Sequence, residues 1–272
     1  MSCLVMGILN RTPDSFYDGG RTSLTDALRH AREMAAHGCD IVDVGGVKAG
    51  PGAPVSLDEE LSRVAPLVEA LRSETDAILS VETGRPEVAK QVLEMGAGII
   101  NDVTALADPE LAAVCARSGA RLVLMHHGGQ IRGRPRNPRY DDVVADVIET
   151  WRELAEVARS HGVRDEDLIY DPGLDFGKTT FHSLELMRRL PELTEDRRVL
   201  IAASRKDVVG ETLGLPLEER LEGSLALVAL SALYGAAIVR VHDVKESVRV
   251  VRMVEAVMGE RPPAAPIRGL WE

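Results

Sequence analysis

The sequence predicts an α/β fold, specifically a single-domain (β/α)8 TIM barrel spanning residues 1–272. Eight short apolar runs alternate with eight segments of helical spacing, as expected for parallel strands joined by crossover helices. The length of 272 residues suits one such domain, for which roughly 250 residues is typical. Polar side chains follow almost every apolar run, and a barrel gathers the carboxyl ends of its strands on one rim, where its chemistry lies. A doubly wound open sheet is the alternative arrangement of these units.

The predicted strands come in order along the chain, each with its own end residue. They are 4–9 before Asn10, 41–44 before Gly45, 78–81 before Glu82, 99–100 before Asn101, 122–125 before His126, 168–170 before Asp171, 199–203 before Ser204, and 238–241 before His242. We expect these ends to lie together on one face of the molecule.

Helical patterns fill the intervals between the strands. Residues 57–72 show the spacing most plainly, with apolar side chains at positions 57, 61, 64, 67, 68 and 71. The predicted helices are 24–37, 57–72, 86–95, 109–117, 141–160, 181–190, 217–234 and 244–258. Pro86 suits a first helical turn, whereas Pro191 is expected to end a helix. Residues 260–272, which include three prolines, are expected to form an extended C-terminal tail.

Composition excludes several classes of function. A net charge of −11 and a pI near 5.2 disfavour binding to nucleic acid or to an anionic membrane, which requires a basic face. We expect no signal peptide, and no apolar stretch of the sequence approaches 18 residues. Cys3, Cys39 and Cys115 are spaced too widely for a disulfide framework or a CxxC metal site. We therefore expect a soluble, cytoplasmic protein with buried, reduced cysteines.

Three of the strand ends carry hydrogen-bonding groups that suit a flat heterocycle. Glu82, Asn101 and Asp171 would point into the barrel mouth from strands 3, 4 and 6. A carboxylate accepts two parallel hydrogen bonds from an amino-imino edge. Phe176 could add an exposed aromatic wall. The alternative interpretation is that each polar residue only caps the helix that follows.

The last two strand ends predict an anion site. Ser204, Arg205 and Lys206 follow the seventh strand, while Arg240 and His242 share one face of the eighth. Loops 7 and 8 of such barrels often hold phosphate, and arginine forks suit phosphate oxygens.

Two other patterns are set aside. The segment 173–179 has three residues between its glycines where a phosphate-binding P-loop has four, so a nucleotide triphosphate site is excluded. His126 and His127 lack a second nearby ligand pair, which disfavours zinc. The basic loop with Arg132, Arg134, Arg136 and Arg139 is either a solvated charge run or a lid over an anionic substrate.

Taken together, the motifs resemble the dihydropteroate synthase family over nearly the whole chain. Residues 10–20 (NRTPDSFYDGG) are similar to its NxTPDSFxDGG signature, and residues 171–178 (DPGLDFGK) to its DPGxxFGK segment. SRK at 204–206, RVHD at 240–243, and Asn101 with Asp102 match further family segments. The resemblance implies a TIM barrel and a homodimer independently of the strand count.

The resemblance also implies an activity and a set of roles. The family condenses 6-hydroxymethyl-7,8-dihydropterin pyrophosphate with p-aminobenzoate, a step of folate biosynthesis that releases pyrophosphate. By matching motif, Asn10 would help to hold Mg²⁺ and pyrophosphate, and Arg240 and His242 would grip the leaving group. The pterin would be held by Asn101, Asp171 and Lys206, with Glu82 at the strand-3 position of the same mouth. Ser204 and Phe176 would lie near p-aminobenzoate. The residues implied to be catalytic are Asn10, Lys206, Arg240 and His242.

Three positions depart from the family pattern. The usual ESTRPG-type second loop is replaced by VKAGPG at 47–52, which lacks the threonine and arginine that contribute to the acceptor and pyrophosphate sites. Glu82 replaces the aspartate of the SVDT segment, and one added methylene moves a carboxylate by about 1 Å. Asp175 stands where the family commonly has glycine and is expected to repel the carboxylate of p-aminobenzoate. These changes resemble a divergent paralogous subgroup.

Other functions compete with the synthase. One is a pterin-binding paralogue that uses another acceptor or is catalytically inactive. Another is a pterin-dependent methyl transferase, against which stands the suitability of Arg240, His242 and Lys206 for pyrophosphate. A sugar-phosphate barrel leaves the first-loop signature unexplained.

Overall fold

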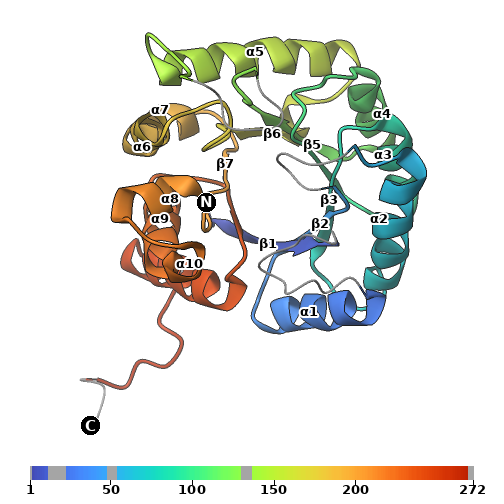
Figure 1. Ribbon diagram of the computed structural model, residues 1–272. Coiled ribbons are helices and arrows are strands. Elements are labelled where there is room, and N and C mark those ends of the chain that lie inside the picture. The colour runs from blue at the N-terminus through green and yellow to red at the C-terminus, as the bar shows by residue number, and fades with distance from the viewer. Residues whose placement is uncertain (1, 12–22, 48–53, 130–136, 269–272) are drawn as a thin grey trace.

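The computed structural model describes residues 2–11, 23–47, 54–129 and 137–268, which form a barrel of parallel strands surrounded by helices (Figure 1). The strands are β1 (Leu4–Asn10), β2 (Ile41–Gly45), β3 (Ile78–Glu82), β4 (Ile99–Asp102), β5 (Arg121–Met125), β6 (Leu168–Asp171), β7 (Leu200–Ile201) and β8 (Ile238–Val241). Their order around the sheet is β6-β5-β4-β3-β2-β1-β8-β7, and all pairs are parallel. The predicted (β/α)8 barrel is confirmed.

The barrel closes between β6 and β7 through a short seam. A single bridge joins Tyr170 to Val199, and the amide of Tyr170 donates to the carbonyl of Arg198 at 2.9 Å. By contrast, β1 and β2 pair over five successive residues. The seventh strand, predicted over 199–203, is therefore only two residues long, because most of the run has no ladder partner on the β6 side.

Alternation along the strands divides the core into two layers. Side chains that face the barrel axis form a compact apolar plug below the rim; they are Met6, Ile41, Ile99, Val123, Ile169, Leu200, Ala202 and Ile238. Side chains that face outward, such as Val42 and Val44 of β2, pack beneath the helices in a larger cluster. Cys3, Cys39 and Cys115 are buried in this outer layer, as predicted.

The helices form the outer ring in Figure 1. They are α1 (Leu24–Ala36), α2 (Leu57–Leu71), α3 (Pro86–Glu94), α4 (Glu110–Ser118), α5 (Val143–Ser160), α6 (Thr180–Arg188), α7 (Leu190–Thr194), α8 (Asp207–Leu213), α9 (Leu221–Leu233) and α10 (Val244–Val257), with short 3₁₀ turns η1 (Asp165–Asp167) and η2 (Leu217–Glu219). Side-chain caps begin several of them; Ser23, for example, accepts from the amide of Asp26 at the start of α1.

Three helical predictions differ from the structure. Pro191 does not end the helical region, because it occupies the first turn of α7, where a missing N–H costs nothing. The helix predicted over 217–234 is divided into η2 and α9 at Arg220, whose guanidinium is held by the carbonyls of Leu215 and Arg205. The short helix α8 was not predicted, although Gly214 ends it in the left-handed conformation.

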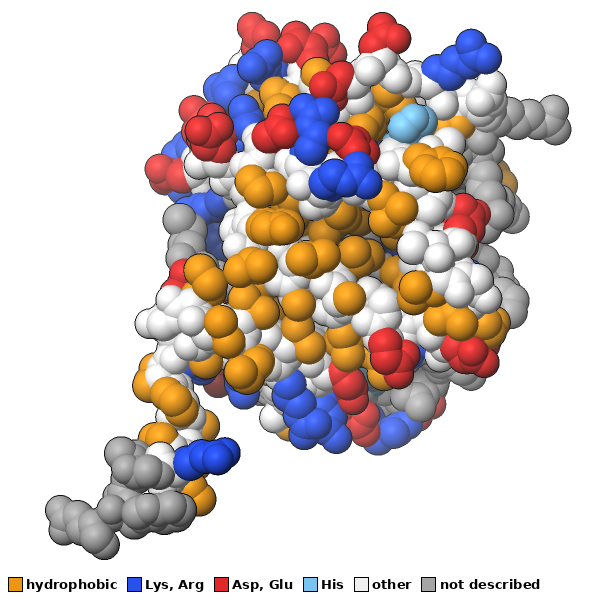
Figure 2. Space-filling model, turned by 90° about the vertical axis from the view of Figure 1, so that its left-hand side faces the viewer, with side chains coloured by type: hydrophobic (Ala, Val, Ile, Leu, Met, Phe, Trp, Pro, Cys, Tyr) orange, Lys and Arg blue, Asp and Glu red, His pale blue; other side chains and the backbone are white. Residues whose placement is uncertain are grey.

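One face of the molecule exposes apolar side chains. Figure 2, which views the molecule from the left-hand side of Figure 1, shows hydrophobic side chains gathered over much of that face. Leu233 of α9 is 46% exposed, and Met253 and Val257 of the adjacent α10 are 63% and 71% exposed. No helix in the described part of the chain is long and apolar enough to cross a membrane.

Candidate active site

The predicted polar residues meet at the carboxyl rim of the barrel. Asn10, Glu82 and Asp171 end β1, β3 and β6 on the side that faces the axis, and Asn101 is the last residue of β4 on that side. His242 follows β8 directly, and Lys206 lies in the loop between β7 and α8. The remaining first-loop residues 12–20, the altered second loop from Lys48 onward, and Arg132, Arg134 and Arg136 lie outside the described residues.

The Arg240 guanidinium lies at the centre of the mouth between two carboxylates. Its Nε donates to Asp43 Oδ2 at 2.7 Å, and a terminal nitrogen donates to Glu82 Oε2 at 2.7 Å. Asp43 is fully buried and Arg240 is 14% exposed. The predicted cation is therefore present, but both of these donor positions are occupied by the protein itself.

Asp43 organises this centre and was not predicted. It accepts from Arg240, from Asn101 Nδ2 at 3.0 Å and from Ser80 Oγ at 2.5 Å. The sequence carried a signal, because Asp43 is a lone carboxylate within an apolar run. It shares the inward face of β2 with Ile41 and Gly45.

Burial changes the protonation of the Glu82 carboxylate. Loss of water raises the pKa of Glu82 to about 7, although the Arg240 guanidinium opposes this change and the Asp43 carboxylate adds to it. Glu82 thus titrates near neutral pH, whereas an exposed glutamate does so near pH 4.

A second group of residues lies on the β6–β7 side of the mouth. Asp171 accepts from the amide of Gly173 at 2.7 Å, and burial raises its pKa. Lys206 donates to the carbonyl of Leu174 at 2.7 Å, and its ammonium lies 4.9 Å from the centroid of the Phe176 ring. Burial lowers the pKa of Lys206, while the Asp171 carboxylate opposes this effect. The predicted proximity of these groups is confirmed.

His242 contributes hydrogen bonds rather than positive charge. Burial, followed by the neighbouring Arg240, lowers the pKa of His242 to about 4, so the ring is neutral at pH 7. Its backbone amide donates to Ser204 Oγ at 3.2 Å, and Nδ1 lies 3.2 Å from the same oxygen. His242 therefore brings a neutral hydrogen-bonding group to the predicted anion site.

Arg205 and Asp175 also have structural roles that the sequence did not indicate. Arg205 forms a two-pronged ion pair with Asp243, with both distances 2.8 Å. Asp175 accepts from the amide of Val208 in the first turn of α8 at 3.0 Å, and from Ser183 Oγ at 3.0 Å. Its carboxylate therefore joins α8 and α6, while the repulsion of an acceptor at the entrance stays a prediction.

Asn10 lies against the backbone of β2. A Cβ atom on Gly45 would meet the amide oxygen of Asn10 at 2.7 Å, so glycine at this position lets the side chain of Asn10 lie close to β2. No group of three potential metal-binding His, Cys, Asp or Glu side chains occurs in the described ranges. The amide oxygen of Asn10 can still bind Mg²⁺, which takes one or two protein ligands and completes its shell with water and substrate phosphate.

Lys178 ties the loop after β6 to the end of β5. Its ammonium donates to the carbonyls of Phe176, Gly173 and His126 at 3.0, 3.1 and 3.2 Å, and lies 2.7 Å from His126 Nδ1. On the other side of the ring, His126 Nε2 lies 2.7 Å from Asp146 Oδ1. Burial lowers the pKa of Lys178 to about 7 and that of His126 to about 4. A neutral imidazole protonated on Nε2 satisfies both contacts.

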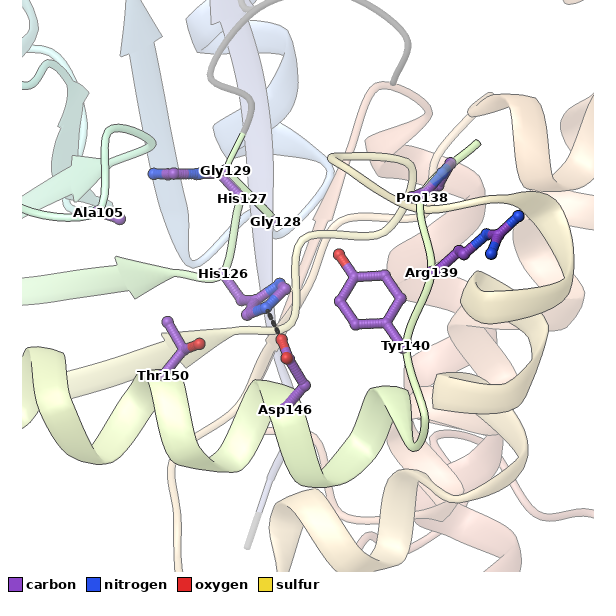
Figure 3. Close-up of a pocket in the computed structure, with 10 residues that line it drawn as sticks. All are labelled: Ala105, His126, His127, Gly128, Gly129, Pro138, Arg139, Tyr140, Asp146 and Thr150. Carbon is purple, nitrogen blue, oxygen red and sulfur yellow. Dashed lines mark hydrogen bonds and ion pairs between the residues drawn. The ribbon is translucent and has the colours of Figure 1, made fainter. Parts of the chain in front are cut away.

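A cavity of about 300 Å³ lies beside this contact, at the end of β5 (Figure 3). Its lining residues are Ala105, His126, His127, Gly128, Gly129, Pro138, Arg139, Tyr140, Asp146 and Thr150. Arg139 of the predicted basic loop lines it, but none of the residues predicted to be catalytic or to bind the pterin does. The cavity therefore adjoins the mouth without containing its polar centre.

The mouth combines groups that can bind the edge of a flat heterocycle with a guanidinium that is paired with two carboxylates. Asn101 and Asp171 offer amide and carboxylate groups, and Lys206 offers an ammonium above an aromatic ring. These groups suit a nitrogen-rich heterocycle. A family described as pterin binding enzyme matches residues 6–242, so the chain is a (β/α)8 barrel of that class.

More particularly, the chain belongs to the dihydropteroate synthase family. The dihydropteroate synthase of Escherichia coli (strain K12) is 43% identical over 94% of this chain and 92% of its own length. A crystal structure of the Yersinia pestis dihydropteroate synthase with a sulfonamide drug complex has a TM-score of 0.91 and 40% identity, covering 96% of this chain and 95% of the other. The protein named inactive dihydropteroate synthase 2 from Mycobacterium leprae (strain TN) is 48% identical over 98% of this chain and 94% of its own length.

Proposed function

We propose that this protein is a dihydropteroate synthase-type transferase. It would condense 6-hydroxymethyl-7,8-dihydropterin pyrophosphate with p-aminobenzoate and release pyrophosphate. The observation that carries the proposal is the convergence of Asn101, Asp171 and Lys206 on the mouth of a barrel of this family, beside the Arg240 guanidinium.

The proposed reaction is a displacement at the exocyclic methylene of the pterin. The amine nitrogen of p-aminobenzoate forms a bond to this carbon, the carbon–oxygen bond to pyrophosphate breaks, and the amine loses a proton. Asn101 and Asp171 would hold the pterin edge, and Lys206 its opposite side. Arg240 and the neutral His242 would hydrogen-bond the departing pyrophosphate, whose charge grows in the transition state.

Mg²⁺ would be held by Asn10 together with pyrophosphate oxygens. This role is supported by the place of Asn10 at the rim end of β1 and by the preference of Mg²⁺ for oxygen ligands. When bound, the ion would neutralise part of the leaving-group charge.

The acceptor would approach past Ser204 and Phe176. The ligand p-aminobenzoate is bound in a solved family member from Xanthomonas albilineans.

A second candidate is pterin binding without the synthase reaction. Two observations favour it: Arg240 is already paired with Glu82, and a relative with 48% identity is named inactive. In this case the protein would bind the pterin at the same place but would not release pyrophosphate.

We also propose that the protein is a cytoplasmic homodimer. The apolar face on α9 and α10 supports this proposal, because exposed apolar patches of this kind mark protein interfaces. A two-fold axis buries such a patch against the same patch of a second copy.

The proposed function is tested by titrating the protein with 6-hydroxymethyl-7,8-dihydropterin and then assaying product. We expect saturable pterin binding, and formation of dihydropteroate when the pyrophosphate ester, p-aminobenzoate and Mg²⁺ are supplied. Binding without product would select the second candidate. No binding of the pterin would contradict both.

A further inference from the structure

The carboxylate of Glu82 binds the Arg240 guanidinium, the group that a diphosphate would need. Arg240 uses its Nε for Asp43 and one terminal nitrogen for Glu82, each at 2.7 Å. Two carboxylates thus surround one guanidinium, and the three groups together carry a formal charge of −1 when all are ionised. An incoming diphosphate therefore meets a guanidinium whose positive charge is already exceeded by the negative charge of its two carboxylate partners.

The neighbouring described cations do not replace this lost charge. Arg205 forms a bidentate ion pair with Asp243. The ammonium of Lys178 binds three backbone carbonyls and the imidazole of His126. His242 is neutral at pH 7 because its pKa is lowered to about 4. Lys206 remains, and it lies on the β6–β7 side with one bond to the Leu174 carbonyl.

We propose, resting on the pterin-binding function above, that Glu82 is a specificity-determining residue that competes with the diphosphate group of the pterin for the Arg240 guanidinium. The mouth then discriminates little between a 6-hydroxymethyl pterin and its diphosphate ester. The length of the side chain matters, because an aspartate is shorter by one methylene and its carboxylate lies about 1 Å further from the fork.

Proton uptake by Glu82 relieves the competition. Its carboxylate faces Asp43 on β2, Arg240 on β8, Lys206 after β7 and Glu60 on α2, and burial outweighs the attraction of the two cations. Below pH 7 the protonated group holds Arg240 less strongly. A bound diphosphate would favour this protonation, so its binding is accompanied by proton uptake.

The test is calorimetric titration with inorganic pyrophosphate and Mg²⁺ at pH 8 and pH 6. At pH 8 we expect Glu82→Gln to bind pyrophosphate at least about tenfold more tightly than the wild type, since one unit charge a few ångströms away is removed. Glu82→Asp is the second variant and should gain in the same direction. Circular dichroism establishes that each variant is folded.

The matched control is Glu60→Gln, which removes a buried carboxylate near Glu82 that pairs with Arg85 instead of Arg240. This variant should change pyrophosphate affinity by less than about twofold. Lowering the pH should raise wild-type affinity relative to Glu82→Gln, a comparison that cancels the titration of pyrophosphate itself. Equal affinities in the wild type and both Glu82 variants would overturn the inference.

A parallel titration with 6-hydroxymethyl-7,8-dihydropterin separates this inference from the proposed function. If the pterin does not bind while Glu82→Gln gains affinity for pyrophosphate, the competition stands and pterin binding fails. If the pterin binds and its diphosphate ester binds the wild type more than tenfold tighter, the competition fails and the proposed function stands.

Discussion

Arg240 and Asp43 show how a single buried charge depends on its partners. Asp43 is fully buried and accepts from Arg240, Asn101 and Ser80. Removing Asp43 leaves the buried donors of Arg240, Asn101 and Ser80 without this acceptor in a medium of low polarity. The contribution of Asp43 to stability is therefore much larger than that of a surface ion pair.

Replacing Asp43 by alanine should lower the free energy of unfolding by about 3 kcal/mol, because the Arg240 charge and two polar side chains lose an acceptor. Urea unfolding of the two proteins measures the difference. Glu110→Ala is the control, since its pair with Arg117 is exposed and should contribute less than about 1 kcal/mol. Equal losses in the two variants would contradict the central role of Asp43.

Lys206 is the cation of the mouth that is best placed for the pterin, because it lies over Phe176 next to Asp171. We expect Lys206→Ala to weaken binding of 6-hydroxymethyl-7,8-dihydropterin at least about tenfold, the effect of losing one charged hydrogen bond. Fluorescence titration measures the affinity. Lys245→Ala, an exposed residue of α10, is the control. Unchanged affinity for Lys206→Ala would mean that the pterin lies elsewhere.

At the same scale, the sequence predicted the rim residues but not their partners. Glu82, Asn101, Asp171 and Lys206 were predictable because strand alternation and topology bring strand ends together. The pairing of Arg240 with Asp43 was not, since it joins residues 197 positions apart in the chain. The roles of Arg205 and Asp175 also depend on loop conformations, both with positive φ, that local sequence does not determine.

Among the elements, the loop after β6 depends most on one side chain. Lys178 binds the carbonyls of Gly173 and Phe176 within this loop and joins them to His126 at the end of β5. Phe176 and Leu174, which contact Lys206, belong to the same loop. The position of the pterin-side groups thus depends on an ammonium that lies beneath them.

This burial gives the fold a pH dependence with a definite sign. The folded-state pKa of Lys178 is about 7, lowered mainly by burial, whereas the unfolded chain keeps the proton to about pH 10.4. Between these values the unfolded state binds more protons, so the contribution of Lys178 to stability rises with pH. The unfolding free energy of the wild type should therefore rise relative to Lys178→Met from pH 7 to pH 10. Urea unfolding curves that stay parallel over this range would contradict the assignment.

The helices and strands were largely predictable from the sequence, because period and boundary residues repeat in every unit. The exceptions lie around β7. There the strand is short, Pro191 lies in the first turn of α7 instead of ending a helix, and α8 and η2 are inserted before α9. These differences depend on tertiary contacts such as those of the Arg220 guanidinium, which no local pattern shows.

At the scale of the whole molecule, the apolar face and the barrel mouth are separate features. The face is formed by outer helices, while the mouth is formed by strand ends and the loops after them. Exposed apolar side chains of α9 and α10 are not needed to cover the barrel, which their buried residues already do. Association of two copies through this face would leave the mouths on both barrels intact.

Replacing Leu233 by glutamate should convert the dimer into monomers, because a charge at the centre of an apolar interface has no partner there. Light scattering after size-exclusion chromatography measures the mass at about 10 µM protein. The control is Ile267→Glu, an apolar residue of the tail that is 76% exposed. A wild-type mass of one chain, or a dimer in the Leu233 variant, would contradict the proposed interface.

The most direct test of the proposed transferase is pyrophosphate release from 6-hydroxymethyl-7,8-dihydropterin pyrophosphate with Mg²⁺, measured with and without p-aminobenzoate. We predict release that depends on p-aminobenzoate and matches the dihydropteroate formed. If pyrophosphate is not released while the pterin is bound, the protein is a pterin-binding member of the family and not a synthase.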